Sequence, residues 1–152
     1  MPSTPSPGRP FDEAELGAWH GMLRTHACVI RALDERLARR HGLSVSEFDV
    51  LITLANAPNR ERRMTELAES VMLSPSGLTR LVARLERAGL VKRRQDASDA
   101  RSFRTSLTAA GATKLRAARS THNAVIRELY LDRLTSAQRR DLGRAWATVL
   151  GA

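Results

Sequence analysis

The period of the apolar residues changes at Gly89, and this change constrains the fold of the chain more than any other feature of its sequence. Before it, Ser74 followed by Pro75 is typical of an N-cap and the first residue of a helix. The helix that they open has a single apolar stripe, made of Leu78, Leu81, Val82 and Leu85. After Gly89, residues 90–95 and 101–107 have extended patterns, and the second alternates at a period of two. The polar tip 96–100 joins them, which predicts a hairpin.

A shorter helix precedes the one that Ser74 opens. Thr65 is its expected N-cap, residues 62–64 are an extended connector, and Met72-Leu73 is a tight turn. The second helix has an outer face of hydrogen-bonding and cationic side chains, made of Ser76, Thr79, Arg80, Arg84 and Arg87. A short helix, a tight turn, a second helix with a polar face and a two-stranded ribbon together predict a winged helix-turn-helix.

A long helix is expected from Asp12 to about His41, ended by Gly42. Its apolar residues form a heptad-like seam of Leu16, Trp19, Leu23, Ile30, Leu33 and Leu37. Such a helix is about 45 Å long, more than a chain of this size normally covers along its own side. We therefore expect part of it to pack against a second copy.

The remaining helix boundaries follow from capping patterns. Ser44 and Glu47 form a capping box for a second helix, Thr108 caps a fifth, and Thr135 with Gln138 opens a sixth. The predicted fold class is mainly α with a small β-wing, in the order α-α-β-α-α-β-β-α-α. The predicted regions are a disordered tail (1–10), an N-terminal dimerisation helix (11–42), the winged helix (43–107) and C-terminal dimerisation helices (108–152).

The positive charge of the chain is concentrated in its middle. The net charge is +9, and residues 74–119 have 11 cationic against 3 anionic residues, a net of +8. Residues 1–73 have a net of −1. A local excess of this kind indicates a surface for nucleic acid rather than a uniform bias of composition.

Other classes of protein lack support in the sequence. No apolar run approaches the roughly 20 residues that span a bilayer, and the N-terminus lacks the apolar segment of a signal peptide, so we expect a cytoplasmic protein. A single cysteine and four scattered histidines give no pattern for a metal site, and no cofactor is expected. Phosphate loops, nucleophile motifs and clustered carboxylates are missing, so an enzyme is not expected.

Four blocks in order resemble the MarR family of bacterial transcriptional regulators, over most of residues 12–150. They are residues 64–68 (MTELA), 74–91 (SPSGLTRLVARLERAGLV), 96–101 (DASDAR) and 107–111 (LTAAG). The resemblance implies a homodimer held by the N- and C-terminal helices, which places two winged helices on an inverted-repeat operator in double-stranded DNA. Repression by occlusion, relieved by a small-molecule effector, is the function that it implies.

The resemblance also implies the residues that contact DNA. Ser74, Ser76, Thr79, Arg80 and Arg84 would lie along the recognition helix, reaching bases or phosphates. Arg101 of the wing, braced by Asp99, would enter the minor groove, and Arg94 or Arg104 would hold flanking phosphates. Ala100 replaces an arginine that is common at the tip of the wing in this family.

The effector is the least defined part of the prediction. The family often binds aromatic or phenolic anions, and the candidate contacts are Trp19, His20, Met22 and His26 on the first helix. Cys28, with Arg24 and Arg31 one turn to either side, is a candidate peroxide-sensing thiol. Two alternatives thus stay open: a thiol-sensing regulator, and a non-specific basic protein without ligand control.

Overall fold

The computed structural model describes residues 8–99 and 101–151, and within them the chain forms six α-helices, three strands and two single-turn 3-10 helices. The elements are α1 (Glu13–His41), α2 (Val45–Asn56), η1 (Pro58–Arg60), β1 (Glu61–Arg63), α3 (Met64–Ser70), α4 (Pro75–Arg87), β2 (Val91–Gln95), β3 (Phe103–Leu107), α5 (Ala109–Leu129), η2 (Leu131–Arg133) and α6 (Ser136–Leu150). The predicted fold class and order of elements are confirmed. Most of the predicted N-terminal tail lies outside the described residues.

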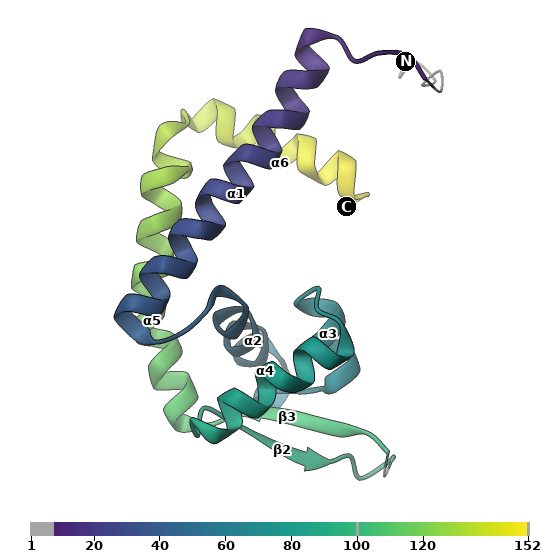
Figure 1. The fold of residues 1–152 in the computed structure, drawn as a ribbon, viewed down its shortest axis with the longest axis vertical. Helices are drawn as coiled ribbons and strands as arrows, with labels where there is room; N and C mark the ends of the chain where they lie inside the picture. The colour runs from purple at the N-terminus through teal and green to yellow at the C-terminus, as the bar shows by residue number, and fades with distance from the viewer. Residues whose placement is uncertain (1–7, 100, 152) are drawn as a thin grey trace.

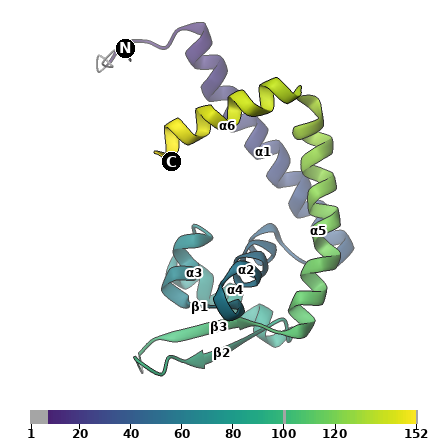
Figure 2. The same ribbon diagram turned by 180° about the vertical axis from the view of Figure 1, so that it is seen from behind.

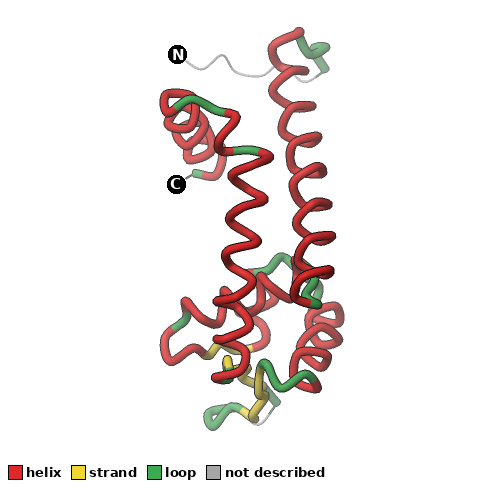
Figure 3. Tube along the Cα trace, turned by 90° about the vertical axis from the view of Figure 1, so that its left-hand side faces the viewer, coloured by secondary structure: helices red, strands yellow, loops and turns green. Residues whose placement is uncertain are grey.

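The chain has two parts (Figure 1). The winged helix, from α2 to β3, lies at one end, and α1, α5 and α6 extend away from it. From behind, the wing strands lead directly into the base of α5 (Figure 2). Helices α1 and α5 run side by side, while α6 stands apart from the winged helix (Figure 3).

Capping residues fix most helix ends where the sequence predicts them. Ser44 and Thr135 are N-caps in capping boxes, and Gly42 ends α1 with a left-handed φ of 64°. The predicted N-cap Thr65 is wrong, because α3 already begins at Met64 and Arg63 is its N-cap. The Glu66 carboxylate accepts a hydrogen bond from the Arg63 backbone N–H, so the glutamate at N3 favours an N-cap two residues before the predicted one.

The predicted hairpin is present as β2 and β3, and β1 joins it to make a three-stranded antiparallel sheet in the order β1-β3-β2. The extended connector expected at residues 62–64, which is the first β of the predicted order, corresponds to strand β1, with Arg62 opposite Thr105 of β3. β3 also pairs with β2, where Arg93 lies opposite the same Thr105. Pairing with β1 satisfies the outer backbone groups of β3, which would otherwise be an open edge.

The hydrophobic core lies between α2, α4 and the first half of α5. Its largest fully buried side chains include Phe48, Leu51 and Leu54 of α2, and the predicted stripe of α4 packs against them. Leu78, Leu81, Val82 and Leu85 are all buried, so only the opposite face of α4 is available to a ligand.

The base of the wing approaches α5 very closely at Gly111. A Cβ at this position would lie 2.0 Å from the carbonyl oxygen of Leu90. The Thr108 hydroxyl caps α5 and also donates to the Gly89 carbonyl oxygen at 2.7 Å. The wing and α5 are therefore joined through backbone contacts that tolerate no side chain.

Polar contacts attach α5 to α1, and a stacked pair of rings attaches it to α2. Arg36 of α1 makes two hydrogen bonds with Glu128 of α5, at 2.6 and 2.9 Å. His41 Nε2 lies 2.8 Å from the Thr121 hydroxyl, and the ring of His122 stacks on Phe48 with centroids 4.4 Å apart. Helix α5 thus links the winged helix to the long helices.

None of the described helices is both long and apolar enough to cross a membrane. The described residues also contain no group of three or more His, Cys, Asp or Glu side chains able to hold a metal ion.

Candidate nucleic-acid interface

Helices α3 and α4 form a helix-turn-helix around Met72. Met72 has a φ of 52°, the left-handed region that glycine usually occupies, and its side chain is 92% exposed. The Leu73 amide donates to the Ala68 carbonyl at 3.1 Å, which closes the turn. Ser74 then caps α4, its hydroxyl accepting from the Gly77 amide at 3.1 Å. Helix α4, which is 13 residues long, begins directly after this turn. Its N-terminus is a favourable place for a phosphate.

The exposed face of α4 presents hydroxyl groups at its N-terminal end. Ser74 and Ser76 are exposed, with their oxygens 3.4 Å apart. Thr79 is exposed as well, but its hydroxyl donates to the Pro75 carbonyl at 2.8 Å. Thr79 therefore has acceptor capacity and a methyl group to offer DNA, while its proton is used within the helix.

Two arginines on this face, Arg80 and Arg84, differ in their surroundings. Arg84 Nε donates to Glu47 Oε1 at 3.2 Å, so α2 holds this guanidinium. Glu47 also closes the capping box of α2 by accepting from the Ser44 amide. Arg80 is exposed, and no acidic side chain of the described residues pairs with it. Of the two, only Arg80 has its full set of donors free.

Acidic side chains also engage the two predicted phosphate contacts of the wing. Arg94 makes two hydrogen bonds with Glu61, and Arg104 donates to both Glu61 and Asp96. The hydrogen bond from Arg94 is the largest cause of a lowered pKa of Glu61. These arginines lie in the wing as predicted, but their charge is largely balanced within it.

Asp96 organises the start of the tip. It is 7% exposed, and it accepts from the Ser98 amide at 2.9 Å, the Ser98 hydroxyl at 2.7 Å and Arg63 Nε at 2.9 Å. The two bonds from Ser98 are the largest causes of a pKa far below the usual range of an aspartate. The polar tip predicted at residues 96–100 contains Asp96 but does not single it out. Its Asp-x-Ser spacing, which favours a turn closed by the aspartate, is the sequence pattern that indicates this role.

Asp99 holds Arg101 through the backbone. The Asp99 carboxylate accepts from the Arg101 amide at 2.9 Å, and the Asp99 carbonyl accepts from the Ser102 amide at 2.9 Å. The guanidinium of Arg101 is exposed, and no acidic side chain of the described residues pairs with it. Ala100, the departure from the family pattern, lies outside the described residues.

The predicted effector and redox residues lie on α1, away from the winged helix. Trp19, His20 and His26 are exposed and Met22 is half-buried. None of them lines either of the two hollows found in the described part of the chain. Cys28 is exposed and free.

The chain resembles known regulators over almost its full length. A sequence model of the MarR family matches residues 41–102. A curated relative, an HTH-type transcriptional repressor of Mycobacterium tuberculosis, is 32% identical over 136 residues, which cover 88% of this chain and 91% of the relative.

Two solved structures from Streptomyces coelicolor have the same fold. Sco3205, a MarR family transcriptional regulator solved in complex with DNA, has a TM-score of 0.89 and 32% identity, and the match covers 96% of this chain and 91% of that one. AbsC, also described as a MarR family transcriptional regulator, has a TM-score of 0.86 and 27% identity, with 94% and 96% covered.

Proposed function

Because the chain belongs to the MarR family of transcriptional regulators, we propose that it is a repressor that binds an inverted-repeat operator as a homodimer and leaves it when a small effector binds. The observation that carries the proposal is a pair of free guanidiniums at the two positions where a winged helix meets DNA. Arg80 projects from the recognition helix and Arg101 from the tip of the wing, and neither has an acidic partner in the described residues. Arg80 suits a guanine in the major groove and Arg101 the negative potential of the minor groove.

The other cations of the winged helix have a supporting role in this proposal. Arg94, Arg104 and Arg84 lie on the same elements, but each shares its charge with a glutamate or an aspartate. The hydroxyls of Ser74 and Ser76, beside the exposed N-terminus of α4, supply contacts to phosphate that place the helix without reading sequence.

The homodimer is proposed from apolar surface outside the winged helix. No described residue of α6 is buried, and its Val149 and Leu150 are 73% and 79% exposed. Trp19 and Leu23 of α1 are half exposed at 50% and 44%. Apolar side chains in such numbers at one end of a chain favour contact with a second copy.

Release by an effector rests on the family resemblance. Trp19, His20, Met22 and His26 are its predicted contacts, and a second copy packed on α1 would bring further side chains to them. A ligand that fits only one spacing of the two winged helices lowers DNA affinity by the difference between its affinities for the two states.

Selection from random DNA duplexes at about 150 mM salt tests the proposal. We expect enrichment of an inverted repeat whose half-sites are about one helical turn apart. Light scattering on the selected complex measures whether two chains are bound per duplex. Enrichment of no palindrome would instead indicate a non-specific basic protein.

A further inference from the structure

A hollow of about 360 Å³ lies between α3 and α4, beside the exposed face of the recognition helix. Its apolar walls are Met64, Ala68, Met72, Leu73 and Leu78. Pro75 and Thr79 form its edge on α4, and both are exposed. The hollow is much wider than a single methyl group, so its edge on α4 is the part that an approaching base meets first.

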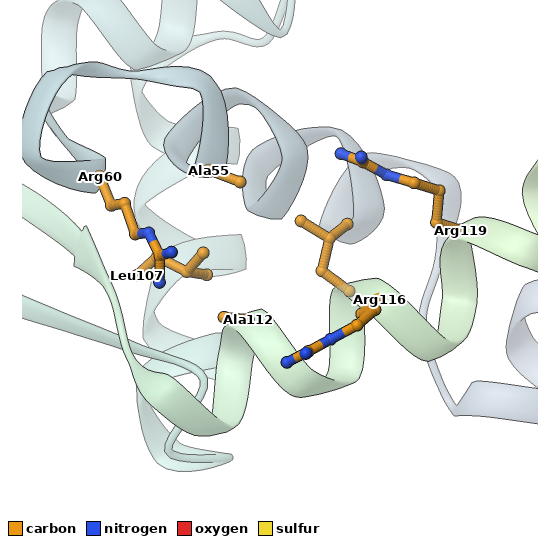
Figure 4. A pocket seen from close by; sticks show the side chains of 7 residues that line it. Ala55, Arg60, Leu107, Ala112, Arg116 and Arg119 are labelled. Carbon is orange, nitrogen blue, oxygen red and sulfur yellow. The ribbon is translucent and has the colours of Figure 1, made fainter.

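The charge of the lining argues against a phosphate at this edge. The hollow between α2 and α5 has three arginines in its lining, Arg60, Arg116 and Arg119 (Figure 4). The hollow between α3 and α4 has no cation among the described residues that line it, and Glu69 is the one charged side chain there. A carboxylate repels the phosphates of DNA, so this edge suits an uncharged group.

A hydrogen bond within α4 fixes the side chain of Thr79. The hydroxyl donates to the Pro75 carbonyl at 2.8 Å, so its proton is not available to a base. The hydroxyl and the methyl group occupy different staggered positions on Cβ, so the same bond also fixes the direction of the methyl group.

Pro75 extends the apolar surface of Thr79 along the helix. It lies four residues before Thr79, on the same side of α4, and it has no backbone N–H. The edge therefore offers DNA a methyl group and a proline ring, with no hydrogen-bond donor. Base groups that accept hydrogen bonds, such as guanine O6 and N7, find no partner here.

We propose that Thr79 and Pro75 recognise the 5-methyl group of a thymine in each half-site of the operator. The 5-methyl group of thymine is the one apolar group that bases present in the major groove. The inference rests on the proposed function and assigns Thr79 a readout of base identity. Arg80, the next residue, has donors for a guanine, so a methyl contact and a guanidinium lie side by side on α4.

Replacement of thymine by deoxyuridine in the operator tests the contact, because it removes the methyl group and keeps the base pair. Each thymine of the half-site is replaced in turn, in both half-sites at once, and fluorescence anisotropy with the full chain measures the Kd at about 150 mM salt. We expect one position at which the Kd of wild type rises about fourfold per half-site, or about fifteenfold in all, the loss that one buried methyl group gives.

Variants of Thr79 assign the effect to this residue. Thr79→Ser keeps the hydroxyl and lacks the methyl group, so its Kd values for the two operators should agree within about twofold, with the thymine operator bound about fifteenfold more weakly than by wild type. Thr79→Val keeps a methyl group and lacks the hydroxyl, so it should retain the preference for thymine. Thr148 makes the same kind of bond on α6, to the Arg144 carbonyl at 3.1 Å, and Thr148→Ser should behave like wild type.

The ratio of the two Kd values for one protein does not depend on how much of that protein is active, so it decides the outcome. The inference is overturned if deoxyuridine is tolerated at every position, or if Thr79→Ser keeps the full preference for thymine. Loss of the preference in Thr79→Val would also overturn it, because the hydroxyl oxygen would then be the group that reads the base. A chain that selects no operator would overturn the proposed function itself, whereas a selected operator that tolerates deoxyuridine overturns the methyl contact alone.

Discussion

The Glu61 carboxylate receives two hydrogen bonds from the Arg94 guanidinium, one from Nε at 2.9 Å and one from Nη2 at 2.7 Å. It also accepts from Arg104, so one side chain of β1 pairs with an arginine on each of the other two strands of the wing. Arg101 at the tip has no such partner in the described residues. The arginines of the wing are therefore unequal, and DNA should respond differently to the loss of each.

Arg101→Ala is expected to weaken operator binding by about 1–3 kcal/mol, because it removes a free guanidinium placed for the minor groove. Arg94→Ala is expected to weaken operator binding by less than about 1 kcal/mol, because the Arg94 guanidinium already forms an ion pair with Glu61. Fluorescence anisotropy at about 150 mM salt measures both. Gel filtration should give the same size for each variant. Equal losses would contradict the ranking of the two arginines.

Glu47→Gln is expected to release Arg84 for DNA. Glutamine retains the capping box with Ser44, so α2 should keep its stability, while the 3.2 Å ion pair with Arg84 is lost. The salt dependence of operator binding should steepen by about one unit in the log–log slope, with tighter binding at low salt. Glu35→Gln makes the same change of charge at an exposed position on α1, and its slope should match wild type. A slope for Glu47→Gln equal to that of the control would show that Arg84 is not held back from DNA.

Asp96→Asn is expected to lower the stability of the wing in a pH-dependent way. The pKa of Asp96 is depressed in the folded chain, chiefly by the hydrogen bonds from Ser98. The carboxylate therefore stabilises the fold fully above its unfolded pKa of about 4, and this stabilisation is lost as the pH falls below that value. Wild type should melt at a higher temperature than Asp96→Asn at pH 7, and the gap should narrow at pH 3. A gap of the same size at both pH values would mean that the charge of Asp96 contributes nothing.

Local patterns explain which parts of the fold the sequence predicts well. The stripe of α4, the Ser44–Glu47 box and the left-handed Gly42 each depend on residues within a few positions of one another. The extended segment that forms strand β1 is predicted too, but its pairing with β3, over 40 residues later, is not, because three residues contain no pattern that indicates a partner strand.

Long-range ion pairs are the part of the candidate interface that the sequence does not predict. A charge count locates the net positive region but does not show which cations are balanced. Arg84 pairs with Glu47, which is 37 residues away in the sequence, and Arg104 pairs with Glu61, which is 43 residues away.

Gly111→Ala is expected to destabilise the chain by at least about 1–3 kcal/mol, the usual cost of overpacking. The new Cβ would lie 2.0 Å from the backbone oxygen of Leu90, and backbone cannot move aside as a flexible side chain can. Gly17→Ala is the matched control, because a Cβ there meets nothing within 4 Å and should stabilise α1 by about 0.5–1 kcal/mol. Urea unfolding of the three proteins measures the difference. Equal stability of the two variants would contradict the close approach of α5 to the wing.

Cys28→Ser is expected to bind the operator like wild type, both before and after treatment with peroxide. Cys28 is exposed on α1, but it is the only cysteine in the sequence, so an oxidised thiol has no partner within the chain for a disulfide. Anisotropy with and without stoichiometric peroxide measures the effect, and mass spectrometry reports whether the thiol was oxidised. Peroxide that releases wild type but not Cys28→Ser would favour the thiol-sensing alternative. Equal behaviour of oxidised wild type and the variant leaves a bound ligand as the means of regulation.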